Sequence, residues 1–232
     1  MVKVSSSNPP SVQQMFEKLA PRYDAANTFI SLGRDKPWRI AAIKAINAPE
    51  NGTVLDIATG TGPVAYLWST YGVNVIGVDF SHEMLRVADS KSGRHKKQVD
   101  FIGGDALKLP FPDNSFDGSL CAFGLRNMAD KDLALAEMRR VVRPGRKVGI
   151  LDFTSPQNPL VRPIFEQYMK RVIPFVGGRI TGNPDPYRYL GNSIKNFMTP
   201  EDLAERMKKA GLSGTKIRRL NMGSVMLCTG MK

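Results

Sequence analysis

Glycine and aspartate residues cluster after an early apolar run, where a ligand-binding turn would lie. Asp56 is followed by Gly60, Thr61 and Gly62, and Asp79 ends the next apolar run. Two glycines in such a turn let the backbone approach a ligand closely. A carboxylate at the end of the second strand can accept hydrogen bonds from both hydroxyls of a ribose. The combination predicts a nucleoside-containing cofactor, and it fits NAD as well as S-adenosylmethionine.

Three details favour S-adenosylmethionine over NAD. Asp56 stands just before the glycines, where its carboxylate can reach a positively charged amino group. Met84 follows Asp79 at a spacing that places its side chain against an adenine ring. Asp105, with Ala106 beside it, follows the third apolar run, where a carboxylate can accept a hydrogen bond from the adenine amino group. Each residue also has an ordinary structural role, so the prediction rests on their joint order and spacing.

The elements that must position these residues alternate between strand and helix. Short apolar runs are typical of buried parallel strands, and segments with helical spacing lie between them. This alternation predicts an α/β doubly wound sheet, in which ligands bind beyond the carboxyl ends of the strands. The predicted strands are residues 53–58, 73–79, 99–102, 116–123 and 147–153.

Cap and turn signals mark the later elements. Asp130 is expected to cap a helix that stops at residues 143–145, where proline and glycine end the pattern. Thr199 is expected to cap another helix. Residues 216–220 and 224–228 are predicted to pair as an antiparallel hairpin. The chain is therefore expected to close a mostly parallel sheet with antiparallel strands.

Composition limits the classes of function. The 232 residues carry a net charge of +12 and have a sequence pI near 9.9. The cysteines, Cys121 and Cys228, cannot form a disulfide framework, and with only two histidines no metal site is expected. The positive charge predicts either an anionic partner, such as nucleic acid or a membrane surface, or a role in solubility alone.

The chain is expected to form one domain with local additions. No stretch approaches the roughly 18 apolar residues of a membrane-spanning helix, and residues 1–10 lack the apolar core of a secretory signal. We therefore expect a cytoplasmic protein, with peripheral contact at the inner face of the membrane as a further hypothesis. Residues 1–10 are predicted to be a loose end, and residues 11–232 a single domain. Within this domain, residues 11–48 are expected to form a helical cap and residues 155–197 an insertion over the site.

Four longer stretches carry a resemblance to a known family. They are YDAAN at 23–27, LPFPDNSFD at 109–117, FGLRN at 123–127 and YRYLGNSI at 187–194. Through them the chain from residue 12 to residue 232 resembles the class I methyltransferases. Within that class it is most similar to the quinone C-methyltransferases of ubiquinone and menaquinone biosynthesis.

The resemblance implies a Rossmann-like sheet of seven strands that ends in an antiparallel hairpin. It implies S-adenosylmethionine as the cofactor and a polyprenyl quinol as the acceptor. Tyr23 is implied to lie on an N-terminal helix that closes over the cofactor. The implied cofactor contacts are Thr61, Asp79, Asp105, Ala106 and the backbone near Ala122.

A quinol ring carbon is a good nucleophile only when the neighbouring hydroxyl is at least partly ionised. The site therefore needs a group that stabilises a phenolate. Arg126 is the candidate because its guanidinium stays cationic at any working pH, although a structural ion pair is its alternative role. Asn127 is expected to orient a water that Arg126 polarises. Asp24 and Asp152 are both left open as the final proton acceptor.

The favoured hypothesis is methylation of demethylmenaquinol to menaquinol. Its alternatives are a methyltransferase for another small phenolic or lipid acceptor, an RNA methyltransferase, and a non-catalytic scaffold that binds S-adenosylmethionine. Departures from the family pattern, among them Pro63 and Ala122, leave the exact acceptor open. Nucleic acid is not the expected partner, because the sequence shows no appended RNA-binding module. A homodimer is left open.

Overall fold

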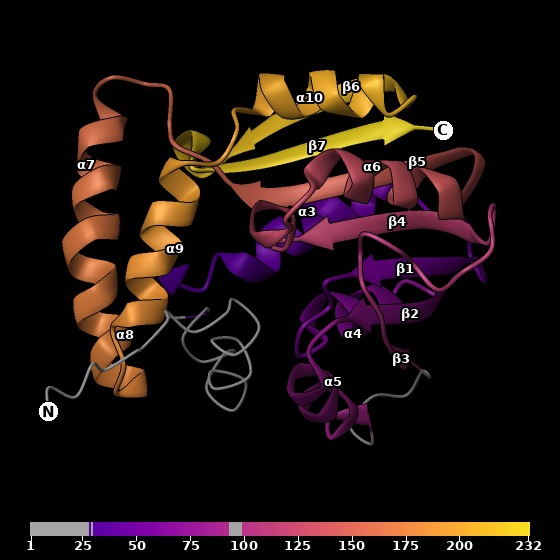
Figure 1. The fold of residues 1–232 in the computed structure, drawn as a ribbon, viewed down its shortest axis with the longest axis horizontal. Helices are drawn as coiled ribbons and strands as arrows, with labels where there is room; N and C mark the ends of the chain where they lie inside the picture. Colours follow the sequence, from indigo (N-terminus) through magenta and orange to yellow (C-terminus); the bar gives the residue numbers. More distant parts are fainter. Residues whose placement is uncertain (1–27, 29, 93–98) are drawn as a thin grey trace, which may run out of the picture.

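The protein is described by a computed structural model that covers Thr28, residues 30–92 and residues 99–232. One sheet with the strand order β3-β2-β1-β4-β5-β7-β6 runs through the molecule (Figure 1). Strands β1 to β5 are parallel, and β6 and β7 form the antiparallel pair that the sequence predicted. The structure adds that β7 also pairs antiparallel with β5 and so lies between β5 and β6. The strands are β1 (Thr53–Ile57), β2 (Asn74–Asp79), β3 (Val99–Gly103), β4 (Phe116–Ala122), β5 (Val142–Phe153), β6 (Ser213–Leu220) and β7 (Val225–Met231).

Successive residues of the central strands enter two cores on opposite faces of the sheet. In β1, Val54 belongs to the core that contains α3 (Asp35–Ile46) and α4 (Pro63–Ser69). Its neighbour Leu55 belongs to the core that contains α6 (Lys131–Val141) and α10 (Pro200–Lys209). Helix α5 (His82–Asp89) packs against β2 and β3. Burial on both faces explains why these strands are continuous apolar runs.

Two helices begin with the caps that the sequence predicts. The Asp130 carboxylate accepts hydrogen bonds from the backbone amides of Asp132 and Leu133, at 3.0 and 2.9 Å, where α6 begins. Thr199 and Asp202 form a reciprocal capping box at the start of α10. Each cap satisfies backbone donors that the first turn of a helix leaves unpaired.

Strand β5 begins earlier than the sequence predicts. Helix α6 ends at Val141 and β5 starts at once with Val142, which pairs with Phe116. The register then shifts, and regular pairing resumes at Lys147, where the sequence placed the start of the strand. Gly145 lies in between with a φ of 75°. The proline and glycine that stop the helix are accommodated here because an irregular stretch of strand does not need every backbone N–H.

Residues 155–197 form a helical unit beside the sheet (Figure 1). Helix α7 (Val161–Gln167) continues through the π-helical turn η4 (Tyr168–Val172) into α8 (Ile173–Thr181), and α9 (Asp185–Lys195) packs against them. Their small core is separate from those of the sheet. The buried residues of this small core are Met169, Ile173, Tyr187 and Ile194.

The expected N-terminal cap is described only in part. Tyr23, Asp24 and residues 1–10, which were predicted to be a loose end, lie outside the described residues. Helix α3, within the expected cap, packs on β4 and β5 and thus belongs to the sheet layers.

Close contact between α3 and the sheet generates a stability prediction. A Cβ atom at Gly118 of β4 would lie 2.6 Å from Cγ2 of Ile46 on α3. We expect Gly118→Ala to lower the free energy of unfolding by about 1–3 kcal/mol, because the added methyl group overpacks this contact. Urea unfolding measures the change. Ile46→Ala opens space for the added methyl group. The loss of unfolding free energy in the double variant should therefore be smaller than the sum of the losses in the two single variants. Strictly additive losses would contradict this account.

Candidate functional site

A cavity of about 460 Å³ lies where the parallel strands end. Its wall comes from the segments that follow β1, β2, β3 and β4, which is the usual ligand position in a doubly wound sheet. With Arg39 of α3 added to these, the cavity brings together residues from five separate segments of sequence. The expected site residues that line it are Asp56, Gly60, Asp79, Met84, Asp105, Ala106, Ala122 and Asn127.

The Asp79 carboxylate connects two turns of the cavity. One oxygen, Oδ2, accepts a hydrogen bond of 2.8 Å from the backbone N–H of Gly60, and Oδ1 accepts one of 2.9 Å from Ser81. Burial raises the pKa of Asp79, while these amide hydrogen bonds oppose the shift. Two amides thus hold the carboxylate in one orientation, and each oxygen keeps a lone pair for a ligand hydroxyl.

Asp56 is a buried acid in the cavity wall. Its side chain is 1% exposed, and Oδ2 accepts a hydrogen bond of 2.6 Å from the Thr59 hydroxyl. Burial raises the pKa of Asp56 to about 7, against the lowering effects of the Thr59 hydrogen bond and the positive charge of Arg39. A cationic ligand group next to Asp56 would favour its ionised form.

In the glycine turn after β1, Gly60 faces the cavity whereas Gly62 packs against the protein interior. Gly60 has a φ of 57°, and a Cβ atom there would meet no other atom within 4 Å, so a ligand has room at this backbone. Gly62 has a φ of 80°, and a Cβ there would lie 2.9 Å from the ring of Phe101. Thr61 is fully buried, and its carbonyl accepts a hydrogen bond from Lys91. Neither Thr61 nor Gly62 is among the residues that line the cavity.

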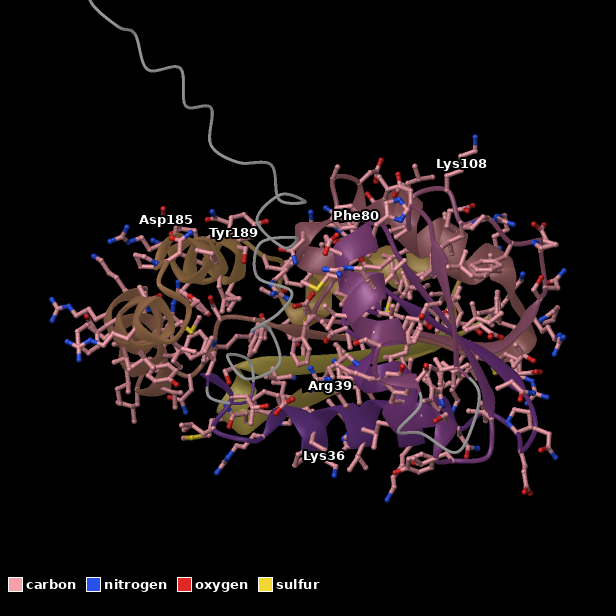
Figure 2. The ribbon with its side chains drawn as sticks, turned by 90° about the horizontal axis from the view of Figure 1, so that it is seen from below. Lys36, Arg39, Phe80, Lys108, Asp185 and Tyr189 are labelled. Atoms are coloured by element: carbon pink, nitrogen blue, oxygen red, sulfur yellow. The ribbon has the colours of Figure 1, made fainter. Side chains whose placement is uncertain are left out.

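The segments after β2 and β3 supply a second part of the wall. Phe80 and the buried Met84 follow Asp79, and both line the cavity. Figure 2 labels Phe80. Asp105 accepts a hydrogen bond of 2.9 Å from the backbone N–H of Leu107, which fixes its side chain in the turn after β3. An aromatic ring, a thioether and a carboxylate acceptor thus line the same part of the cavity.

Arg126 is held in a buried ion pair behind the cavity wall. Its Nη1 donates to Oδ1 of Asp152 at 2.7 Å and to the carbonyl oxygen of Phe123 at 2.6 Å. The two charged side chains are 5% and 0% exposed. The guanidinium also lies over the Phe153 ring, with Cζ 5.6 Å from its centroid. Arg126 is not among the lining residues, whereas its neighbour Asn127 is.

Asn127 is connected to the helical unit through Tyr189. The Tyr189 hydroxyl on α9 donates a hydrogen bond of 3.1 Å to Oδ1 of Asn127. Burial raises the pKa of Tyr189, and the positive charge of Arg126 opposes the rise. The charge of Arg126 therefore acts on an ionisable hydroxyl beside Asn127.

Sequence reasoning gave no role to three side chains of this region. Arg39 on α3 and Phe123 after β4 line the cavity, and Tyr189 contacts Asn127. The signal for Arg39 is a charged residue directly after Trp38 on a helix that packs on the sheet. The signal for Tyr189 is its place in one of the stretches that carry the family resemblance. Neither signal shows which distant residue the side chain meets.

Comparisons with known proteins show the family of the chain. The model of the ubiE/COQ5 methyltransferase family matches residues 1–232. The demethylmenaquinone methyltransferase of Deinococcus radiodurans is 42% identical over 224 residues, which cover 96% of this chain and 92% of the relative. The enzyme of the same name from Thermus thermophilus is 41% identical over 201 residues, covering 86% and 91%.

Solved structures share the fold at lower identity. A SAM-dependent methyltransferase from Thermotoga maritima, described as a possible histamine N-methyltransferase, superposes with a TM-score of 0.69 at 20% identity, covering 95% of this chain and 99% of that one. A second neighbour is phosphoethanolamine N-methyltransferase 2 of Haemonchus contortus, solved in complex with S-adenosyl-L-methionine. It superposes with a TM-score of 0.65 at 18% identity, covering 94% of this chain and 60% of that one. These neighbours confirm the predicted Rossmann-like sheet, and the family match confirms the predicted methyltransferase class. The chain belongs to the ubiE/COQ5 methyltransferase family.

Proposed function

We propose that this protein transfers the methyl group of S-adenosylmethionine to a ring carbon of a demethylated polyprenyl quinol, with demethylmenaquinol as the first candidate. The observation that carries the proposal is the order of polar groups along the cavity. The strand order β3-β2-β1-β4 places Asp105, Asp79, Asp56 and Asn127 in sequence across the sheet edge. This order matches adenine, ribose, amino acid and acceptor. The relatives named demethylmenaquinone methyltransferases support the same acceptor.

The cavity residues fit the donor in chemistry as well as in order. Asp79 is assigned to the ribose hydroxyls, and Asp105 to the adenine amino group. Met84 and Phe80 are assigned to the adenine faces, and Asp56 to the ammonium group. Gly60 fits because a side chain at this position would occupy cavity space. When bound, S-adenosylmethionine supplies a methyl group already activated on a sulfonium.

Asn127 and Tyr189 are assigned to the acceptor. Because the Asn127 carbonyl accepts from Tyr189, its NH₂ group keeps the donors that a phenolate oxygen needs. The positive charge of Arg126 is assigned to stabilise the same phenolate oxygen without contacting it. This charge already favours ionisation of the neighbouring Tyr189 hydroxyl. We assign Arg126 as a positioning and electrostatic residue and Asn127 as the group that contacts the substrate or its ordered water.

The contacts of Asp152 argue against it as the proton acceptor. Its Oδ1 accepts from Arg126 Nη1 and from the backbone N–H of Phe153, and its Oδ2 accepts from the backbone N–H of Arg126. These contacts commit Asp152 to holding Arg126. We therefore assign proton removal to a water at Asn127, with Asp24, outside the described residues, as the remaining carboxylate.

Methyl transfer to a reduced quinone tests the proposed acceptor. Labelled methyl groups from S-adenosylmethionine are expected in chemically reduced demethylmenaquinone held in liposomes, and not in simple phenols or an RNA pool. Asn127→Ala should lower kcat by on the order of 10²–10³, the usual effect of removing one donor to a developing oxyanion. S-adenosylhomocysteine should bind this variant as it binds the wild type, which controls for folding. Label only in RNA or a phenol would exclude the quinol.

The buried acid predicts a pH dependence of cofactor binding. As the pH falls through about 7, Asp56 gains a proton and can no longer pair with an ammonium group. The Kd of S-adenosylhomocysteine should therefore rise with falling pH, by up to about tenfold per pH unit. Calorimetry between about pH 7.5 and about pH 5.5 measures this slope. Asp56→Asn should bind more weakly and lose the slope, whereas an unchanged slope would assign the titration to another group such as Asp79.

We further propose that the exposed face of α7, η4 and α8 contacts an anionic membrane surface. Leu160, Ile164 and Phe175 are 79%, 73% and 60% exposed, while η4 and α8 pack on α9 through Met169 and Ile173. Large apolar side chains on the solvent side of an amphipathic helix are typical of helices that lie in the headgroup region of a bilayer.

Basic residues accompany these apolar side chains. Arg179 lies over the Phe175 ring, with Cζ 4.4 Å from the centroid. Glu166 is the one acidic residue from α7 through α8, and it pairs with Arg162. An excess of basic residues favours anionic lipid headgroups, and a polyprenyl quinol resides in the bilayer. No helix among the described residues is long and apolar enough to cross a membrane. The exposed basic residues are Arg162, Lys170, Arg171 and Arg179.

Vesicle binding tests the membrane contact. Replacing two exposed residues, Ile164→Glu with Phe175→Glu, should weaken co-sedimentation with vesicles that contain phosphatidylglycerol by on the order of tenfold or more, because apolar contact is lost and repulsion is added. Leu133→Glu is the matched control, since Leu133 is 45% exposed on α6 of the sheet domain. Equal binding by the double variant and the wild type, or an equal loss in the control, would refute this surface.

A further inference from the structure

Arg39 is a buried cation in the wall of the cavity. It lies on α3, is 7% exposed and lines the cavity together with Asp56. Figure 2 shows Arg39 on the side of α3 that faces the interior, whereas Lys36 lies on the outer side of the same helix. Burial of a charged side chain is costly unless it is paired and hydrogen-bonded, so its partners indicate its role.

The protein itself satisfies only part of the Arg39 guanidinium. Nη1 forms an ion pair with Oδ2 of Asp35, one helical turn earlier, and Asp35 also accepts a hydrogen bond from Ser31. The Cζ atom lies 5.5 Å from the centroid of the Phe123 ring. The buried Nε has no hydrogen-bond partner. A buried donor without an acceptor is rare in a native protein and requires an explanation.

Asp56 and Arg39 together present opposite charges on the cavity wall. Arg39 is near enough for its charge to lower the pKa of Asp56 against the effect of burial. The amino-acid part of the donor is a zwitterion, with an ammonium group and a carboxylate on one carbon atom. Asp56 alone would leave that carboxylate uncompensated among buried groups. A carboxylate and a guanidinium side by side are the complement of the whole zwitterion.

We propose that Arg39 binds the α-carboxylate of the amino-acid part of S-adenosylmethionine while Asp56 binds its ammonium group. The inference rests on the proposed function and extends it to a residue of α3. It makes Arg39 a determinant of binding for cofactors that carry an amino-acid part. The competing role is a purely structural ion pair with Asp35.

Two nucleosides that differ in the amino-acid part separate these roles. S-adenosylhomocysteine carries the carboxylate, and 5′-methylthioadenosine lacks the whole amino-acid part. Arg39→Gln should weaken binding of S-adenosylhomocysteine roughly ten- to hundredfold, the range for a hydrogen bond to a charged group. Its affinity for 5′-methylthioadenosine should stay at the wild-type value. Lys36→Gln, the matched control on the outer side of α3, should change neither affinity, and calorimetry measures all of them.

Each other outcome has a definite meaning. Equal losses for both nucleosides, or no loss for either, would overturn the assignment of Arg39. Wild-type protein that binds neither nucleoside would overturn the proposed function and this inference with it. Because Arg39→Gln removes the ion-pair partner of the partly exposed Asp35, the double variant Asp35→Asn with Arg39→Gln removes both charges. It should show the same selective loss if the single variant does not fold.

Discussion

The hydrogen bonds accepted by the Asp79 carboxylate are the constraint on which the site depends. Asp79 ends β2, and its two oxygens bind the backbone amides of Gly60 and Ser81. One side chain thus fixes the turn after β1 against the turn before α5. The turn after β3 joins the same arrangement, because the Gly104 amide donates to the Asp79 carbonyl. Without this connection, neighbouring strands would still end at one edge, but their loops would not share a rigid cavity.

Near the turns that Asp79 connects, the protein buries charged side chains that a stable core alone would not need. Two arginines, Arg39 and Arg126, are each paired with an aspartate and each stacked on a phenylalanine. Such pairs are costly to desolvate, and removing one partner is more costly still. Charges that are fixed before a ligand arrives need no reorganisation during a reaction. Phe123 and Phe153 also contact each other, with ring centroids 4.8 Å apart. Both arginine–aspartate pairs therefore lie against the same pair of contacting aromatic rings.

Local patterns in the sequence were sufficient to predict much of the fold and part of the site. The alternation of strand and helix follows from hydrophobic periodicity, and the caps at Asp130 and Thr199 follow from chemistry within one helical turn. Asp56, Asp79 and Asp105 were predictable because the ends of parallel strands bring their neighbours to one edge. The start of β5 was not predictable, because a bulge depends on the partner strand as much as on the bulged residues.

The sequence by itself determined the doubly wound sheet, its antiparallel hairpin and the acidic residues at the strand ends. Only the tertiary structure decided which side chains reach the cavity. Gly60 lines it while its neighbour Gly62 packs against Phe101, a difference that composition does not reveal. Arg39 and Tyr189 arrive from helices far apart in the chain. Their contacts depend on how elements pack against one another, and packing between distant elements leaves no fixed spacing in the sequence.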